Sequence, residues 1–248
     1  MADPGVPTTA EYAAWVEAIA RRLLRHVVPL QVLDAKNLTP AGILAGGTGG
    51  LVKTERRRFV LTAAHVAEAL KREGVLGLLS GGGGSNPVDI SSWSVIASDD
   101  DLDLATIAVP ESFDPAPLQK MFYAPTAWAP PRANREDVAF FVGFPGLHRE
   151  IFTASVLNHA APFCDFVSSS SDRHFVLADQ EGERVVLEYK KQLAQFGPTG
   201  GVSGSPVFIS TGGELVLAGV LKEGGEGHDT VFFAAHAGYV RPDGEIAR

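Results

Sequence analysis

Residues 199–206 read Thr-Gly-Gly-Val-Ser-Gly-Ser-Pro, and the apolar run Val207-Phe208-Ile209 follows directly. Glycine permits backbone conformations that other residues rarely adopt, and it leaves the amide N–H groups around Ser203 uncovered. A serine hydroxyl beside two such N–H groups has the minimum equipment for stabilising an oxyanion. Taken alone, the stretch is equally typical of an ordinary Gly/Ser turn, so the rest of the chain has to decide between the two.

Two upstream segments favour the chemical interpretation. Residues 59–66 read Phe-Val-Leu-Thr-Ala-Ala-His-Val, an apolar strand that runs into small residues and then His65. In residues 99–109 an acidic cluster gives way to a strand-like run, with Asp103 at the junction. The chain order is therefore His65, Asp103, Ser203, which is one of the known orders of Ser-His-Asp triads.

These segments resemble those of the chymotrypsin/trypsin-like serine peptidases in their bacterial, disulfide-free form. Two weaker similarities are Gly47-Thr-Gly-Gly-Leu-Val and Val142-Gly-Phe-Pro-Gly. The resemblance covers roughly residues 40–240. It implies an all-β fold of two six-stranded antiparallel β-barrels, preceded here by an N-terminal helix.

The resemblance also implies a role for each candidate residue. Ser203 is the expected nucleophile, His65 the general base and then acid, and Asp103 the carboxylate that orients the imidazole. The backbone N–H groups of Gly201 and Ser203 are the expected oxyanion hole. The neighbouring acids 99–101 are interpreted as solvated loop charges, because Asp103 directly precedes Leu-Ala and a strand.

Sequence patterns divide the chain into three parts. Residues 1–27 form a helical extension, in which Tyr12, Trp15, Ile19 and Leu23 recur at helical spacing and predict a face packed on a barrel. Residues 28–240 form the peptidase domain, with barrel halves at roughly 28–115 and 135–240, and residues 241–248 form a tail. Strands are predicted at 28–33, 41–44, 49–53, 59–62, 75–79, 88–96, 104–109, 138–144, 151–158, 174–177, 185–188, 207–209, 215–221 and 230–234, with a short helix at 64–72.

Composition limits the possible partners and compartment. The 248 residues are 45% hydrophobic, which suits one large all-β unit, and the net charge of −8 argues against nucleic acid or an anionic membrane as a partner. The single Cys164 cannot form an internal disulfide, and no ordinary Cys/His zinc site is possible with one cysteine. We expect a cytoplasmic protein, unless a leader has been removed, with no metal or cofactor.

Val202 departs from the pattern of secreted trypsin-like enzymes. In those enzymes the residue before the nucleophile is usually an aspartate, which pairs with a new N-terminus released by cleavage. Valine cannot form that ion pair. The hypothesis is that the full-length chain is already competent or is switched by an activating partner protein.

The residues around the expected specificity pocket allow two interpretations of the substrate preference. The resemblance implies that Gly197 lies at the base of the primary specificity pocket. It also implies that Leu221, Lys222, Glu223 and Gly224 border the pocket and the edge where a peptide adds as a strand. An uncharged base favours an apolar or small side chain before the scissile bond, whereas Glu223 or Glu226 could recruit a basic one.

The leading hypothesis is a serine endopeptidase that cleaves a limited range of protein or peptide substrates. The alternative from another class is a catalytically silent or partner-gated peptide-binding module on a trypsin-like fold. The intact set of His65, Asp103 and Ser203 argues against that alternative. A third possibility is an esterase with the same triad, although the usual α/β-hydrolase order, Ser…Asp…His, is absent.

Overall fold

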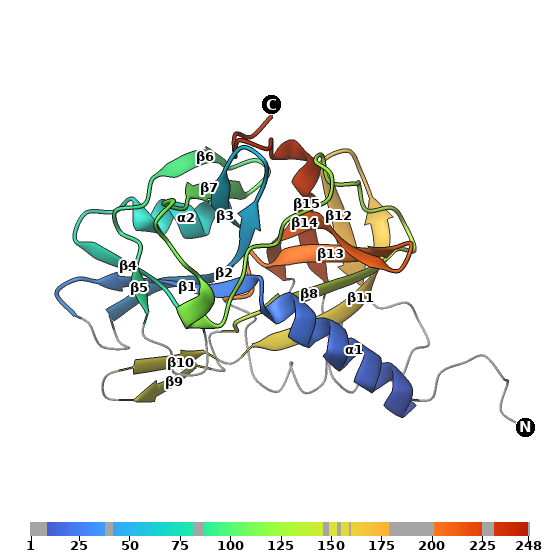
Figure 1. Ribbon diagram of the computed structural model, residues 1–248, viewed down its shortest axis with the longest axis horizontal. Coiled ribbons are helices and arrows are strands. Elements are labelled where there is room, and N and C mark those ends of the chain that lie inside the picture. Colours follow the sequence, from blue (N-terminus) through green and yellow to red (C-terminus); the bar gives the residue numbers. More distant parts are fainter. Residues whose placement is uncertain are drawn as a thin grey trace, which may run out of the picture.

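The computed structural model describes residues 9–37, 42–81, 87–145, 149–152, 155–158, 160–178, 201–224 and 231–247. Most of these residues form antiparallel β-structure in two halves that lie side by side, with α1 along the lower edge (Figure 1). The active-site candidates are divided between the halves: His65 and Asp103 belong to the first, and Ser203 to the second.

The N-terminal half is a seven-stranded sheet in the order β5-β4-β1-β2-β3-β7-β6. Its strands are β1 Val27–Asp34, β2 Ile43–Lys53, β3 Arg58–Thr62, β4 Val75–Leu79, β5 Val88–Asp89, β6 Val95–Asp99 and β7 Leu104–Ala108. The helix α2 (Ala64–Leu70) follows β3 directly, and its buried alanines and Val66 complete the core formed by Leu51, Val60 and Ile107. This core holds the β3–α2 junction rigidly.

The C-terminal half is a closed six-stranded barrel in the order β11-β12-β15-β14-β13-β8. Its strands are β8 Val138–Gly143, β11 Ala161–Ser170, β12 His174–Ala178, β13 Pro206–Thr211, β14 Glu214–Gly224 and β15 Phe232–His236. Three rings fill the interior: Phe141 and Phe163 are stacked with centroids 4.4 Å apart, and Phe232 packs edge-on against both. The 3₁₀ turns η2 (Ala116–Leu118) and η4 (Ala237–Tyr239) complete the described elements.

The helix α1 spans Thr9–Leu24 and packs against β8 and β11 of the barrel (Figure 1). Leu23 is 2% exposed, Ile19 packs in the same cluster, and the Trp15 ring meets Phe140 edge-on at 5.1 Å. The predicted helix and its packing on a barrel are therefore confirmed. The side chain of Tyr12 lies outside the described set.

The all-β fold class predicted from sequence is confirmed, with one closed six-stranded barrel, but the N-terminal half is a seven-stranded antiparallel sheet where six strands were expected. Several strand predictions are also corrected. The strands predicted at 41–44 and 49–53 are one strand, β2, which begins at Ile43, because its glycines fit where side chains would collide: a Cβ on Gly49 would lie 2.6 Å from Val60. Residue 41 lies outside the described residues. Residues 88–96 are two strands, β5 and β6, separated by a turn in which Asp89 accepts a hydrogen bond from the Ser91 N–H at 2.8 Å.

Two further corrections concern the second half. Where one strand was predicted at 151–158, the structure has two strands, β9 (Arg149–Phe152) and β10 (Ser155–Asn158), which pair antiparallel. The strand β11 was not predicted at all, because its proline, cysteine and serines give no clear alternating pattern. The strand predicted at 185–188 lies outside the described residues.

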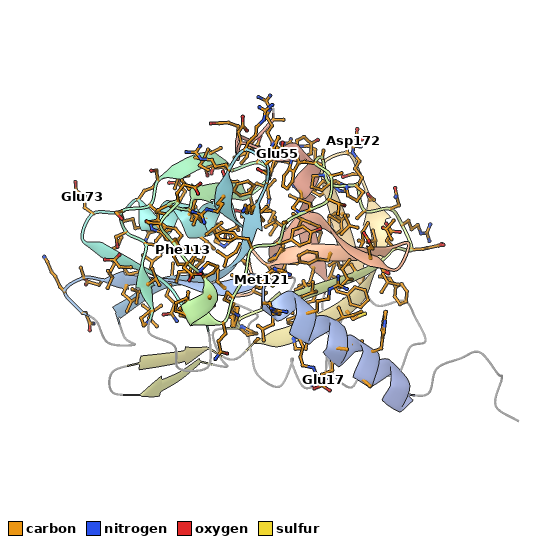
Figure 2. The ribbon with its side chains drawn as sticks, viewed as in Figure 1. Glu17, Glu55, Glu73, Phe113, Met121 and Asp172 are labelled. Carbon is orange, nitrogen blue, oxygen red and sulfur yellow. The ribbon has the colours of Figure 1, made fainter. Side chains whose placement is uncertain are left out.

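The segment 110–137 joins the halves and packs against both of them. Figure 2 shows Phe113 and Met121 on this segment, and the Met121 N–H donates to Arg25 O at 2.7 Å, next to the end of α1. The tail also returns to the first half, since Thr106 Oγ1 donates to Gly244 O at 2.6 Å. Over the described ranges, no helix combines the length and apolar character that crossing a membrane requires.

Candidate active site

His65 lies at a strand-to-helix junction of the N-terminal half. The buried strand β3 ends at Thr62, Ala63 is extended, and α2 begins at Ala64. The buried residues of α2 face the sheet, whereas the side chain of His65 is 54% exposed. The imidazole is therefore carried by a rigid element and remains accessible to a substrate.

The carboxylate of Asp103 holds the ring of His65. Its two oxygens lie 3.0 and 2.9 Å from His65 Nδ1, and Oδ1 also accepts the His65 backbone N–H at 3.1 Å. Ala63, the N-cap of α2, has no side-chain oxygen with which to satisfy the free N–H groups of the first helical turn. Asp103 supplies that oxygen from another element, so one carboxylate fixes both the helix start and the imidazole.

An unusual backbone conformation places Asp103. Its φ is +52° in the turn that joins β6 to β7, a region that aspartate tolerates better than most other non-glycine residues. The neighbouring acids have other contacts: Asp99 accepts the Leu102 N–H at 2.9 Å within the turn, and Asp101, 83% exposed, lies 3.7 Å from Arg173. Asp103 is the acid whose carboxylate meets the imidazole.

Ser203 lies on the loop that enters β13 of the barrel. Gly201 and Gly204 on this loop have φ values of +103° and +87°, which favour glycine. A Cβ on Gly204 would collide with Thr48 O and Thr62 Oγ1 and would lie 3.0 Å from Ala63 N. The absence of a side chain at Gly204 thus lets the loop approach the residues that lead into His65.

The backbone of Ser203 is bonded to the other half of the molecule. Its carbonyl oxygen accepts the Thr48 N–H at 2.8 Å. A Cβ on Gly47 would lie 3.1 Å from Ser203 O and 2.5 Å from Val66, the residue after His65. His65 and Asp103 are thus in direct contact, and the backbone of the loop that bears Ser203 lies against β2, close to Val66.

Comparisons with known proteins show the family to which the chain belongs. The profile of the trypsin-like peptidase domain matches residues 47–216, which is more than half of the 248 residues and includes His65, Asp103 and Ser203. The chain belongs to the trypsin-like peptidase domain family. Curated proteins gave no significant match.

A solved structure supports the same fold. It is described as a thermostable serine protease AL20 from an extremophilic microorganism. The alignment of the two structures covers 86% of this chain and 91% of that protein's chain. The TM-score is 0.52 and the sequence identity is 12%. At that identity the similarity concerns the trypsin-like fold alone.

Val202, directly before Ser203, is packed into the core of the trypsin-like barrel. It is 1% exposed, and a Cβ on Gly143 would lie 2.8 Å from its Cγ1. Its carbonyl oxygen accepts from the Ser205 N–H at 3.0 Å and from Ser205 Oγ at 2.6 Å. At the position where an ion pair is expected in secreted trypsin-like enzymes, Val202 is therefore held by apolar packing and by the Ser205 hydroxyl.

Leu221, one of the residues predicted to bind substrate, contacts the serine loop through its backbone. Its carbonyl accepts the Gly204 N–H at 2.7 Å, and its own N–H donates to Ser205 O at 2.9 Å. The Leu221 side chain is fully buried in the barrel core. The adjoining strand β14 is therefore held in register with the loop that carries Ser203.

The other predicted substrate-binding residues are Lys222, Glu223, Gly224 and Gly197. Lys222 is half-buried, and it adds to the effect of burial in lowering the pKa of His174. Glu223 and Gly224 pair with Phe233 and Phe232 of β15, and the side chain of Glu223 lies outside the described set. Gly197 lies outside the described residues altogether.

Two buried threonines near the loop are not indicated by sequence reasoning. Thr48 and Thr62 are fully buried, and Thr62 Oγ1 donates to Thr48 O at 2.7 Å. The sequence features that could have indicated them are the position of Thr48 between two pairs of glycines at 46–50 and that of Thr62 directly before Ala-Ala-His.

Two of the described histidines, His26 and His236, have structural positions. His26 bonds Met121 O and His236 bonds Ser171 O, and burial lowers the pKa of each. Within the ranges that the structure describes, no group of three or more His, Cys, Asp or Glu side chains is placed to hold a metal ion.

Proposed function

We propose that this chain is a serine endopeptidase that hydrolyses peptide bonds of protein substrates through an acyl-enzyme intermediate. The contact between the Asp103 carboxylate and His65 Nδ1, beside the loop bearing Ser203, carries the proposal. Membership of the trypsin-like peptidase domain family supports it.

Proton transfer follows from the way Asp103 holds the ring. A carboxylate accepts hydrogen bonds, so it favours the tautomer with the proton on Nδ1 and leaves the lone pair on Nε2. In the proposed reaction Nε2 takes the proton from Ser203 Oγ as that oxygen attacks the substrate carbonyl carbon. The imidazolium then gives the proton to the leaving amine, and Asp103 stabilises the positive ring.

Charge on the substrate oxygen has to be stabilised as the tetrahedral intermediate forms. The proposed donors are the backbone N–H groups of Gly201 and Ser203. Val202 O is fixed by two hydrogen bonds from Ser205, and because the peptide group is planar this fixes the direction of the Ser203 N–H. Donors held in advance cost no reorganisation during the reaction.

The proposed enzyme acts as the full-length chain, without cleavage of its N-terminus. The buried packing of Val202 supports this, because the loop already has a support other than an ion pair. We further propose a cytoplasmic location, since a single cysteine in the sequence cannot form an internal disulfide. The reaction as proposed uses no cofactor.

A fluorophosphonate probe tests the proposal directly, because it phosphonylates an activated serine. The full-length protein should react at Ser203, with intact mass confirming an unprocessed chain. Ser203→Ala should abolish labelling and His65→Ala should reduce it by about 10³-fold or more. Ser210→Ala is the matched control, since Ser210 is exposed on the same strand β13 and should have no effect.

Labelling that survives Ser203→Ala would place the nucleophile elsewhere and contradict the assignment. A folded wild-type protein that never reacts with the probe would contradict the enzyme proposal. That result would favour a peptide-binding module on the same fold. A requirement for a trimmed N-terminus would overturn only the proposal about activation.

A further inference from the structure

Thr48 makes three hydrogen bonds to two segments, the loop that bears the proposed nucleophile and the end of β8. Its hydroxyl donates to Gly201 O at 2.7 Å and accepts the Phe144 N–H at 3.1 Å. Its backbone N–H donates to Ser203 O at 2.8 Å. Thr48 is fully buried, so these bonds are shielded from water.

These bonds cross between the two halves of the molecule. Thr48 lies on β2 of the N-terminal sheet, whereas Gly201, Ser203 and Phe144 belong to the barrel side. The carbonyl of Thr48 is itself held by Thr62 Oγ1, on the strand that leads to His65. One residue therefore connects the element that carries the base to the loop that carries the nucleophile.

The hydroxyl acts on a residue that cannot fix its own conformation. Gly201 has φ +103° and no side chain, so many conformations are open to it. Holding its carbonyl selects one of them, and with it the direction of the following peptide. Thr48 and Ser205 together hold three consecutive carbonyls, those of Gly201, Val202 and Ser203.

We propose that Thr48 is a positioning residue, whose hydroxyl keeps the Gly201–Ser203 segment in its reactive shape and substitutes for an ion pair at Val202. The inference rests on the proposed serine peptidase function. A hydroxyl suits the task because it donates one hydrogen bond and accepts another at the same atom. Threonine at this position thus couples the two halves at the active site.

The test compares Thr48→Val with Thr48→Ser. Valine keeps the shape and removes the hydroxyl, so kcat for p-nitrophenyl acetate hydrolysis should fall on the order of 10- to 100-fold with KM nearly unchanged, as expected for slight misplacement of reacting groups. The rate of fluorophosphonate labelling should fall in parallel. Serine keeps the hydroxyl and should restore kcat to within about threefold of wild type.

Thr106→Val is the matched control. Thr106 is also fully buried in the N-terminal sheet and donates through Oγ1 to a distant carbonyl, that of Gly244 at 2.6 Å. Both valine variants should show a similar fall in Tm, but Thr106→Val should keep wild-type kcat. If Thr48→Val does not fold, Thr48→Ala serves instead; it also lacks the hydroxyl, so kcat should fall on the order of 10- to 100-fold.

The inference is overturned if folded Thr48→Val keeps wild-type kcat. It is also overturned if Thr106→Val loses as much kcat as Thr48→Val, or if Thr48→Ser is as impaired as the valine variant. Failure of the proposed function has a different signature. In that case the wild-type protein itself neither hydrolyses the ester nor reacts with the probe.

Discussion

The two halves of the molecule hold their parts of the site in different ways. In the N-terminal half, the side chains of His65 and Asp103 bond each other at 2.9 and 3.0 Å. In the barrel, the contacts that place Ser203 all involve the backbone of its loop, either with other backbone groups, as in the bond from Gly204 N–H to Leu221 O at 2.7 Å, or with the hydroxyls of Thr48 and Ser205. The first half therefore places its part of the site by a contact between two side chains, and the second by hydrogen bonds to the backbone of a loop.

Because of this difference, substitutions in the two halves should affect catalysis and stability differently. A change in the His65–Asp103 pair should alter proton transfer while leaving the fold intact, because neither side chain belongs to the apolar core and His65 is 54% exposed. A change in the serine loop should alter both, since residues such as Val202 belong to that core. The predictions below test this separation, beginning with the largest effect.

Asp103→Asn should lower kcat by about 10⁴-fold with little change in Tm. The asparagine oxygen can still accept the His65 backbone N–H, which is bonded at 3.1 Å, so the start of α2 should survive. The amide NH₂ group, however, favours the ring tautomer with the proton on Nε2, which cannot accept a proton from Ser203. Ester hydrolysis and thermal unfolding, measured on the same preparation, check both parts.

Asp101→Asn is the control for that experiment. Asp101 lies two residues away, is 83% exposed and makes only a long contact of 3.7 Å with Arg173. Exposed pairs of this kind contribute little to stability, so activity and Tm should both be unchanged. A large fall in Tm for Asp103→Asn would show that its role is structural.

Val202→Asp should damage stability and activity together. The side chain is 1% exposed and lies against Gly143 in the barrel core, so a charge there would be buried without solvent. We expect the free energy of unfolding to fall by about 3–5 kcal/mol, measured by urea denaturation. Probe labelling of the remaining folded protein should also fall.

Val202→Ala distinguishes loss of packing from the effect of charge. It removes two methyl groups without introducing a carboxylate, so the free energy of unfolding should fall by only about 1–2 kcal/mol. A stable, reactive Val202→Asp protein would mean that the loop can accept an ion pair here after all.

Local sequence signals predicted the N-terminal part of the site well. An apolar strand ending in Thr-Ala-Ala-His gives the β3–α2 junction, and the strand after Asp103 gives β7. Each of these signals lies within a few residues of the chain. The glycines around Ser203 similarly predicted a tight loop, which the φ values of Gly201 and Gly204 require.

Long-range contacts are what sequence reasoning could not supply. The glycines of β2 look like a break in a strand, yet Gly50 is needed because Pro206 of the barrel lies 3.0 Å from where its Cβ would be. Thr48 looks like an ordinary turn residue, and its bond to Gly201 spans 153 positions in the sequence. The strand β11 is likewise defined by its pairing with β8 and β12, because its own residues give no strand pattern.

Lys120 lies on the segment that connects the halves and provides a finer test of how they are joined. It is 7% exposed, and its Nζ donates to Leu24 O at 2.7 Å, at the end of α1. The same nitrogen lies 5.6 Å from the centre of the Phe144 ring, whose backbone N–H bonds Thr48. Burial lowers the pKa of Lys120 from 10.5 to about 8.

Lys120→Met should therefore show the smallest effect, and one that depends on pH. Below the folded-state pKa of about 8, the ammonium is charged in the folded and unfolded chains alike, and its desolvation cost is fully present. Above that value the folded chain loses the proton first, so the stability of wild type rises relative to the methionine variant until the unfolded pKa is passed. Between about pH 7 and about pH 9.5 the difference in the free energy of unfolding should move by about 1–2 kcal/mol in favour of wild type, measured by urea denaturation.

Lys53→Met is the control for this experiment. Lys53 lies at an exposed position of β2, so its replacement should show no such shift with pH. A pH-independent difference for Lys120→Met would mean that the connection between the halves leaves this lysine solvated.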